Sequence, residues 1–312
     1  MKVFDLHGHQ EGLLKASGTN GLPQDVPLGD FYKHGIDASV VCAVGDPNSF
    51  GLGTNSFSMV EQQLEQILEK SNAQSLKVAT TTNELNLVWD SGKTAIFLGV
   101  EGGDFIDNLE MVDRLYNLGV RVLAPVHYSD NQFGSIGFHL DGSGPKLATG
   151  LSKFGAELIT HAQDIGMVID IAHGSDAMII DACKIAKKPL LCSHGGLRMS
   201  YGSKRFMGDE AAHHFRDNGG LLGIWPCRFG KVGLANQEEL VDIILQTIDF
   251  LSWGQVGYCT DVNGAPGYLD DYRGLEDTKG LISELAAKSF TEDKLEQYCN
   301  SNIIRLFQAW GV

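Results

Sequence analysis

Histidines and acidic residues stand at the ends of apolar runs at several points along the chain. Five of the ten histidines and two acids hold such positions: His7, His9, Glu101, His127, His173, His194 and Asp261. If the runs are parallel strands of a barrel, their C-terminal ends open onto one face and these side chains converge there. Imidazole nitrogens and carboxylate oxygens are common ligands of Zn²⁺. The pattern therefore predicts a metal centre at the C-terminal mouth of a barrel.

The spacing within this set indicates chemistry with two ions. His7 and His9 are separated by one residue, so both side chains point to the same side of a strand. A carboxylate from another strand can bridge two ions, which at roughly 3.5–4 Å apart can activate one water molecule for hydrolysis. A single histidine after a strand is more often structural, but seven such residues on one face favour a metal site. The other five histidines are predicted to be surface or helix residues: His34, His139, His161, His213 and His214.

The elements that would position these residues alternate along the chain. Eight short apolar runs are predicted strands, at 2–6, 38–44, 94–100, 121–126, 167–172, 189–193, 221–225 and 256–260. Helical periodicity separates most of them, at 59–71, 109–118, 151–164, 177–187 and 237–251. Alternation predicts parallel strands with right-handed crossovers. Eight such units favour one α/β domain over residues 1–312, a (β/α)8 TIM-type barrel; an open doubly wound sheet is the alternative.

Three other segments complete the predicted architecture. The stretch 281–311 is predicted to form two extra C-terminal helices that close the barrel. The loops 133–149 and 262–279 are long for connections between a strand and a helix, so they could cover a pocket.

The composition and charge of the chain indicate which classes of partner and which cellular location to expect. The 312 residues carry a net charge of −15, and such an acidic surface repels phosphate backbones and anionic lipids. No apolar run reaches the length of a membrane-spanning helix. The six cysteines form no C-x-x-C pair and are predicted to be reduced thiols, mostly in the core. No signal peptide opens the chain. We therefore expect a cytoplasmic protein with no nucleic-acid or membrane partner.

Several motifs resemble the membrane (renal) dipeptidases, a family of zinc peptidases with an amidohydrolase-like barrel. The similar segments are GVEGG at 99–103, GMVIDIAHGSD at 166–176, KKPLLCSH at 187–194, GLSKFG at 150–155, GLED at 274–277 and NIIRLF at 302–307. The resemblance runs nearly from end to end. It implies a metallo-dipeptidase that acts on short peptides, and it allows a homodimer because homodimers occur in that family.

The resemblance also implies a role for each matching residue. His7 and His9 would bind a first zinc ion, His173 and His194 a second, and Glu101 would bridge both.

Three further roles concern the substrate. His127 would polarise the scissile carbonyl, and Arg205, eleven residues after His194, would hold the substrate's C-terminal carboxylate. Asp261 would lie beside the metals and the substrate amine, where it can transfer the proton of the attacking water. The catalytic set implied is thus His127, Asp261 and Glu101.

The chain departs from the family pattern at three positions. His9 replaces the usual aspartate, Asn263 stands where a second aspartate is common, and Asp104 stands where a histidine often follows the bridging motif. These departures keep open an alternative on the same metal core, a hydrolase of a lactone, cyclic amide or N-acyl amino acid. A non-catalytic binding barrel is the alternative from another class, since this fold hosts many functions.

Overall fold

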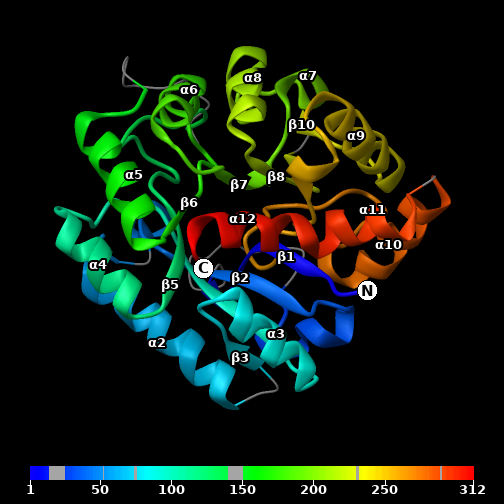
Figure 1. Cartoon of the computed structure of the whole chain (residues 1–312), viewed down its shortest axis with the longest axis horizontal. Coiled ribbons are helices and arrows are strands. Elements are labelled where there is room, and N and C mark those ends of the chain that lie inside the picture. The colour runs from blue at the N-terminus through cyan, green and yellow to red at the C-terminus, as the bar shows by residue number, and fades with distance from the viewer. Residues whose placement is uncertain (14–24, 52, 74–75, 140–149, 230–231, 289) are drawn as a thin grey trace.

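Parallel strands surround the centre of the molecule, and helices lie outside them (Figure 1). The computed structural model describes residues 1–13, 25–51, 53–73, 76–139, 150–229, 232–288 and 290–312. The barrel strands are β1 (Phe4–His9), β2 (Ala38–Val44), β4 (Thr94–Glu101), β5 (Val120–Ala124), β6 (Val168–Ile169), β7 (Leu191–Gly195), β8 (Leu221–Ile224) and β11 (Val256–Gly257). Each falls on one of the eight predicted apolar runs.

Hydrogen bonding runs around the ring of strands. Two sheets have the orders β1-β2-β4-β5-β6 and β11-β8-β7. Parallel bridges join them at both ends, from Asp170 to Leu191 and from Gly8 to Val262. At the second junction the amide of His9 donates to the Val262 carbonyl at 2.8 Å. The predicted α/β barrel is therefore confirmed, and the open doubly wound sheet is not formed.

Helices and short 3₁₀ turns connect the strands, and several of the helices begin at polar capping residues. The helices are α2 (Phe57–Ala73), α3 (Thr82–Asp90), α4 (Leu109–Asn117), α5 (Lys153–Ile165), α6 (Asp176–Ile185), α7 (Arg198–Tyr201), α8 (Asp209–Asn218) and α9 (Gln237–Phe250), with 3₁₀ turns η1 (Leu28–His34), η2 (Pro47–Phe50), η3 (Trp253–Gln255) and η4 (Gly274–Asp277). The side chains of Asn108, Ser152, Ser175 and Asn236 each accept a hydrogen bond from the first turn of the helix that follows. These caps fix where each helix leaves its strand–helix loop.

The C-terminal segment closes the end of the barrel opposite to the mouth. It contains α10 (Thr278–Ala287), α11 (Glu292–Glu296), a π-helical turn (Gln297–Ser301) and α12 (Asn302–Trp310), and α12 crosses the centre of the view in Figure 1. The side chain of Asn302 donates to the carbonyl of Val256, where β11 begins, and the Trp310 indole donates to the carbonyl of Pro189 just before β7. The two predicted helices are thus α10 and the α11–α12 run.

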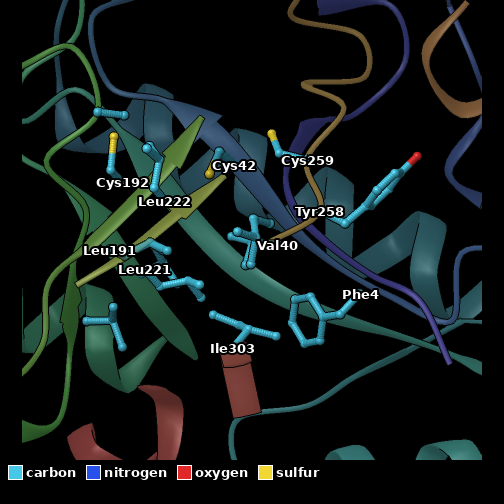
Figure 2. Packing of buried hydrophobic residues seen from close by; sticks show 14 of the residues in the cluster. Phe4, Val40, Cys42, Leu191, Cys192, Leu221, Leu222, Tyr258, Cys259 and Ile303 are labelled. Atoms are coloured by element: carbon cyan, nitrogen blue, oxygen red, sulfur yellow. The ribbon is translucent and has the colours of Figure 1, made fainter. Parts of the chain in front are cut away.

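The barrel strands are buried apart from the half-buried Arg121 of β5, and large side chains fill the barrel. Phe4 lies 5.7 Å from Phe97 and 5.8 Å from Phe307, measured between ring centroids. Figure 2 shows Val40, Leu191 and Leu221 of the same buried cluster. All six cysteines are free thiols and five of them are buried, as predicted.

The structure corrects the sequence prediction at several boundaries. β1 extends to His9 and β7 to Gly195, so His7, His9 and His194 lie within strands and do not follow them. The register of β1 shifts between Asp5 and Gly8, which lets polar side chains continue the strand at the mouth. The periodicity did not predict β3 (Leu76–Val78) or the hairpin of β9 (Arg228–Phe229) and β10 (Val232–Gly233).

The structure describes the two long loops to different extents. Of 133–149, residues 140–149 lie outside the described part of the chain. The loop 262–279 contains η4 and the first residues of α10. Among the described residues, no helix combines the length and apolarity needed to cross a membrane.

Candidate metal centre

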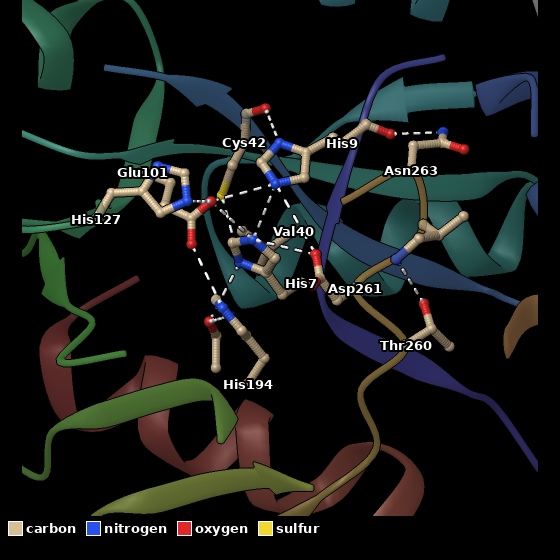
Figure 3. Close-up of polar contacts among 12 residues, drawn as sticks. His7, His9, Val40, Cys42, Glu101, His127, His194, Thr260, Asp261 and Asn263 are labelled. Carbon is tan, nitrogen blue, oxygen red and sulfur yellow. Dashed lines mark hydrogen bonds and ion pairs between the residues drawn. The ribbon is translucent and has the colours of Figure 1, made fainter. Parts of the chain in front are cut away.

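The seven predicted side chains converge at the C-terminal mouth of the barrel, and all seven are buried. They lie in β1, β4 and β7 or within four residues after β5, β6 and β11. Figure 3 shows His7, His9, His127, His194 and Asp261 pointing toward Glu101 or one another. Barrel closure thus brings together residues that are far apart in the sequence. For example, Asn263, in the segment after β11, is hydrogen-bonded to His9 of β1, 254 positions earlier.

One oxygen of the Glu101 carboxylate faces three imidazoles. Its Oε2 lies 3.4 Å from Nε2 of His7, 3.2 Å from Nε2 of His9 and 3.4 Å from Nε2 of His127. Since Glu101 is the last residue of β4, its side chain extends into the centre of the mouth.

The other oxygen of Glu101 faces a second pair of imidazoles. Its Oε1 lies 3.2 Å from Nε2 of His173 and 3.5 Å from Nε2 of His194. This buried oxygen makes no hydrogen bond with acceptable geometry to any described residue. The two oxygens of one carboxylate therefore face different imidazoles: Oε2 faces three of them, including the pair His7 and His9, and Oε1 faces the pair His173 and His194.

Asp261 completes the first group. Its Oδ1 lies 3.9 Å from Nε2 of His7 and 4.0 Å from Nε2 of His9, while its Oδ2 accepts a hydrogen bond from the Trp225 indole at 2.9 Å. One oxygen is thus occupied by the protein and the other is directed toward the histidines.

The nitrogen atoms of this centre fit cations better than hydrogen bonds. Nε2 of His173 lies 2.9 Å from Nε2 of His194, and Nε2 of His7 lies 3.3 Å from Nε2 of His9. The Nδ1 atom of His9 donates to the Cys42 carbonyl at 3.1 Å, which leaves its Nε2 as an acceptor directed at the centre. The imidazole nitrogens cluster around a carboxylate oxygen that has no hydrogen-bond partner among the described residues. Nitrogen and oxygen atoms of these types are the usual ligands in zinc sites. The residues present therefore fit bound metal ions.

The charge states of these groups suit metal binding. Burial, and then the nearby Arg205, lower the pKa of His173 well below its ordinary value, and burial together with His7 does the same for His194. For Glu101, burial raises the pKa, but His127 and His7 outweigh it and hold the pKa well below the usual range. Metal ligands bind as neutral imidazoles and ionised carboxylates, so His173, His194 and Glu101 favour the forms that bind. His7 is the exception: burial lowers its pKa, but Cys42 and Glu101 outweigh burial and raise the pKa well above its usual value, so a bound metal ion must displace the proton of His7.

Two of these residues have an uncommon backbone conformation. His173 has φ 67° and Asp261 has φ 53°, both in the left-handed region that non-glycine residues rarely adopt. Each such residue costs on the order of 1–3 kcal/mol, and strain of this kind clusters at functional sites. The surrounding packing therefore holds these two side chains in place against a local preference.

Hydrogen bonds behind the imidazoles reveal residues that the sequence reasoning missed. Nδ1 of His127 donates to Oδ1 of Asp46 at 2.7 Å, and Ser193 Oγ lies 3.2 Å from Nδ1 of His7 and 3.0 Å from Nδ1 of His194. Asp46 stands two residues after β2, so the same strand-end rule could have found it.

Close approach of two loops brings Asp46 to this position. The amide of Gly45 donates to the carbonyl of Glu101 at 2.7 Å, and a side chain on Gly45 would collide with the carbonyl of Gly102. Only glycine allows the chain after β2 to lie this close to the end of β4.

A pocket opens above the centre. Its polar floor contains the carboxylates and imidazoles described above, and its apolar walls are Leu13, Val44, Phe50, Tyr128 and Trp225. The rings of Phe50 and Tyr128 lie 5.4 and 4.2 Å from the ring of His127. The pocket can therefore take a small molecule with both polar and apolar parts.

Arg205 lies beside this pocket and not in its lining. Together with His173 and Cys192, it lines a small neighbouring cavity. Its guanidinium carbon lies 4.8 Å from the centroid of the Trp225 ring, and only 8% of the residue is exposed. Its buried Nη2 has no hydrogen-bond partner among the described residues. A buried guanidinium nitrogen in this state can bind an anionic group of a ligand.

The remaining histidines mostly lie outside the site. His161 on α5 pairs with Asp113 at 2.6 Å, and His213 on α8 is exposed. The prediction was wrong for His139, which is buried in the loop after β5, 3.6 Å from Asp130.

At a position where the family often has an aspartate, Asn263 stabilises a loop. Its amide donates to the carbonyls of His9 and Val26, both at 2.9 Å, and its carbonyl oxygen accepts from the Val26 amide. A carboxylate could not donate these two hydrogen bonds, so an amide suits this position.

Comparisons with known proteins find sequence similarity to dipeptidases. A 228-residue match is 29% identical to the uncharacterized dipeptidase C965.12 of Schizosaccharomyces pombe and covers 70% of this chain. A 348-residue match is 24% identical to human Dipeptidase 3 and covers 98% of this chain. The chain spans 54% of the length of the yeast relative and 68% of the human one.

A solved structure has the same fold. A metallo peptidase from Rhodobacter sphaeroides, liganded with a phosphinate mimic of the dipeptide L-Ala-D-Ala, superimposes with a TM-score of 0.84 at 19% identity, covering 99% of both chains. The model of the membrane dipeptidase family, peptidase family M19, matches residues 33–310. Since the family model covers residues 33–310 and the fold and the candidate metal ligands are consistent with it, the chain belongs to the membrane dipeptidase family of metallopeptidases.

Proposed function

We propose that this protein is a metal-dependent dipeptidase that hydrolyses short peptides with a free C-terminal carboxylate. The observation that carries the proposal is the placement of the two Glu101 oxygens between two imidazole pairs. Two zinc ions would be held by His7, His9, Asp261 and Glu101 on one side and by Glu101, His173 and His194 on the other. Imidazole and carboxylate ligands support zinc as the metal.

Bound metal ions would lower the pKa of a water molecule and place positive charge beside the scissile carbonyl. The protein would supply the proton transfer. Asp261 directs Oδ1 toward His7 and His9, and burial raises its pKa to about 6 in the metal-free chain. A carboxylate in this place can accept a proton from the attacking water and pass it to the leaving amine.

His127 would stabilise charge on the carbonyl oxygen during attack. Its Nδ1 is bound to Asp46, so its Nε2 is directed into the pocket beside Glu101. An imidazole held in one orientation can donate to a developing oxyanion at little cost in reorganisation.

Removal of the Asp46 charge tests this orientation. In Asp46→Asn, we expect kcat to fall about 10–100-fold, because the amide favours the proton on Nδ1 of His127 less strongly than the carboxylate does. We expect two metal ions per chain to remain bound, because Asp46 is not one of the proposed ligands. Steady-state kinetics and metal analysis would measure both quantities. Asp104→Asn is the control, because Asp104 bonds to Ser129 and Asn131 and not to an imidazole. An unchanged kcat in Asp46→Asn would remove His127 from the mechanism.

Arg205 would hold the substrate's C-terminal carboxylate through its free nitrogen. A carboxylate bound there, beside the second imidazole pair, would place the preceding peptide bond near the metals. This arrangement supports dipeptides as the first substrate class.

Substitution of Arg205 separates binding from chemistry. We expect Arg205→Ala to raise the KM for dipeptides about tenfold or more, with a smaller decrease in kcat, because the lost interaction is present in the bound substrate and in the transition state. Arg216→Ala on the surface of α8 is the control, since Arg216 pairs with Asp217 there. Kinetics identical to wild type in Arg205→Ala would exclude the carboxylate role.

A substrate panel tests the whole proposal. Protein with its metal content measured would be assayed with L,L and L,D dipeptides, lactones and N-acyl amino acids. Turnover of dipeptides above the other classes is expected. Turnover of only lactones or N-acyl amino acids would replace the proposal by the alternative hydrolase, and a metal-loaded protein with no turnover would support a binding role. The cytoplasmic location and the homodimer stay predictions.

A further inference from the structure

The indole of Trp225, the residue after β8, contacts three polar residues of the site. Its Nε1 donates to Oδ2 of Asp261 at 2.9 Å, and its ring lies 4.8 Å from the guanidinium carbon of Arg205. The ring of His194 lies 5.5 Å away at an interplanar angle of 67°. These partners come from three different segments of the chain, and Trp225 is 2% exposed.

The backbone of Trp225 is held independently of these contacts. Its amide donates to the carbonyl of Gly195 in β7 at 2.9 Å, and the hydroxyl of Tyr201 donates to its carbonyl at 3.0 Å. The indole is therefore held by its own backbone and can orient the side chains that contact it.

The hydrogen bond to Asp261 decides which carboxylate oxygen is available. With Oδ2 bound by the indole, Oδ1 is directed at His7 and His9. Asp261 has a strained backbone with φ 53°, so its local conformation does not by itself secure this orientation. A hydrogen bond to a charged acceptor contributes more than a neutral one, so its loss should release the carboxylate.

The ring face has a separate effect on Arg205. The guanidinium group lies over the indole, where cation–π attraction supports it in a buried position. The Nη2 atom remains without a hydrogen-bond partner among the described residues. Stacking on the indole thus holds the Arg205 guanidinium group in place and leaves its Nη2 available to bind a carboxylate.

We propose that Trp225 is a positioning residue that orients Asp261 for proton transfer through its Nε1 and supports Arg205 for substrate binding through its ring. This inference rests on the dipeptidase function proposed above. It links two groups that the sequence separates by 56 positions, Arg205 and Asp261, through one side chain.

Two substitutions separate the two effects. Trp225→Phe keeps an aromatic face for Arg205 and removes the donor to Asp261, whereas Trp225→Leu removes both. Trp310→Phe is a matched control, because the Trp310 indole also donates a hydrogen bond, to Pro189 O at 2.7 Å, and has Lys188 over its ring at 5.3 Å. Trp310 lies at the opposite end of the barrel.

The measurements are kcat and KM for a dipeptide that wild type hydrolyses, and the metal retained after dialysis against a chelator. For Trp225→Phe, we expect kcat to fall about tenfold or more with KM within about threefold of wild type. We also expect one of the two ions to be extracted more readily, because Oδ1 of Asp261 is no longer held toward His7 and His9. For Trp225→Leu, KM should rise about tenfold in addition. Trp310→Phe should match wild type in all three.

Two outcomes would overturn the proposal. If Trp225→Phe matched Trp310→Phe in kcat and in metal retention, the indole donor would not position Asp261. If Trp225→Leu left KM at the value of Trp225→Phe, the ring would not support Arg205. The Phe variant decides the first point even if the Leu variant does not fold. Wild-type protein without dipeptidase activity would contradict the proposed function itself, a result distinguishable from both.

Discussion

Replacement of Glu101 by glutamine is expected to lower kcat/KM about a thousandfold or more and to release metal from both groups of ligands. Each Glu101 oxygen faces a different imidazole pair, so one substitution affects both groups. Glutamine is nearly the same size, but it offers one neutral oxygen and places an NH₂ group against imidazole nitrogens. Loss of the negative charge removes the main attraction for a second cation.

Metal analysis after dialysis, with kinetics on the same preparation, would measure this effect. Glu84→Gln is the control, because Glu84 lies on α3 and bonds only to Thr80 and Thr81 among the contacts described. A folded Glu101→Gln protein that kept two ions and more than about a tenth of the wild-type kcat/KM would contradict the shared-carboxylate arrangement.

Extraction of metal from the wild-type protein should abolish hydrolysis and lower the melting temperature by about 5–10 °C. Without cations, the centre buries two carboxylates and clustered imidazole nitrogens only 2.9–3.3 Å apart, which destabilises the folded state. Binding of ions to the native state alone adds stability in proportion to the logarithm of their concentration over Kd. Addition of Zn²⁺ should restore both properties.

Differential scanning calorimetry and activity before and after chelation would measure these changes. A chelator saturated with Zn²⁺ before addition is the control for effects of the reagent itself. Full activity in protein shown to contain less than about 0.1 ion per chain would exclude metal-dependent hydrolysis. An unchanged melting temperature with lost activity would confine the role of the ions to catalysis.

The sequence alone predicted the elements and residue types of the site. Apolar runs that end in Glu101, His127 or His173 identified parallel strands and the end at which their polar residues meet, because all strands of such a barrel share one direction. Helical periodicity also located the starts of α5 and α6 to within two residues, since the predicted starts 151 and 177 lie close to Lys153 and Asp176.

Only the tertiary structure decided how these side chains face one another. The pairing of Asp46 with His127, the use of both Glu101 oxygens and the contacts of Trp225 depend on which rotamers fit when distant strands pack together. Sequence periodicity describes one element at a time, whereas these distances join elements that only closure of the ring brings into contact. The left-handed backbone at Asp261 opposes the local preference of the residue, so packing across the barrel, and not the local sequence, determines it.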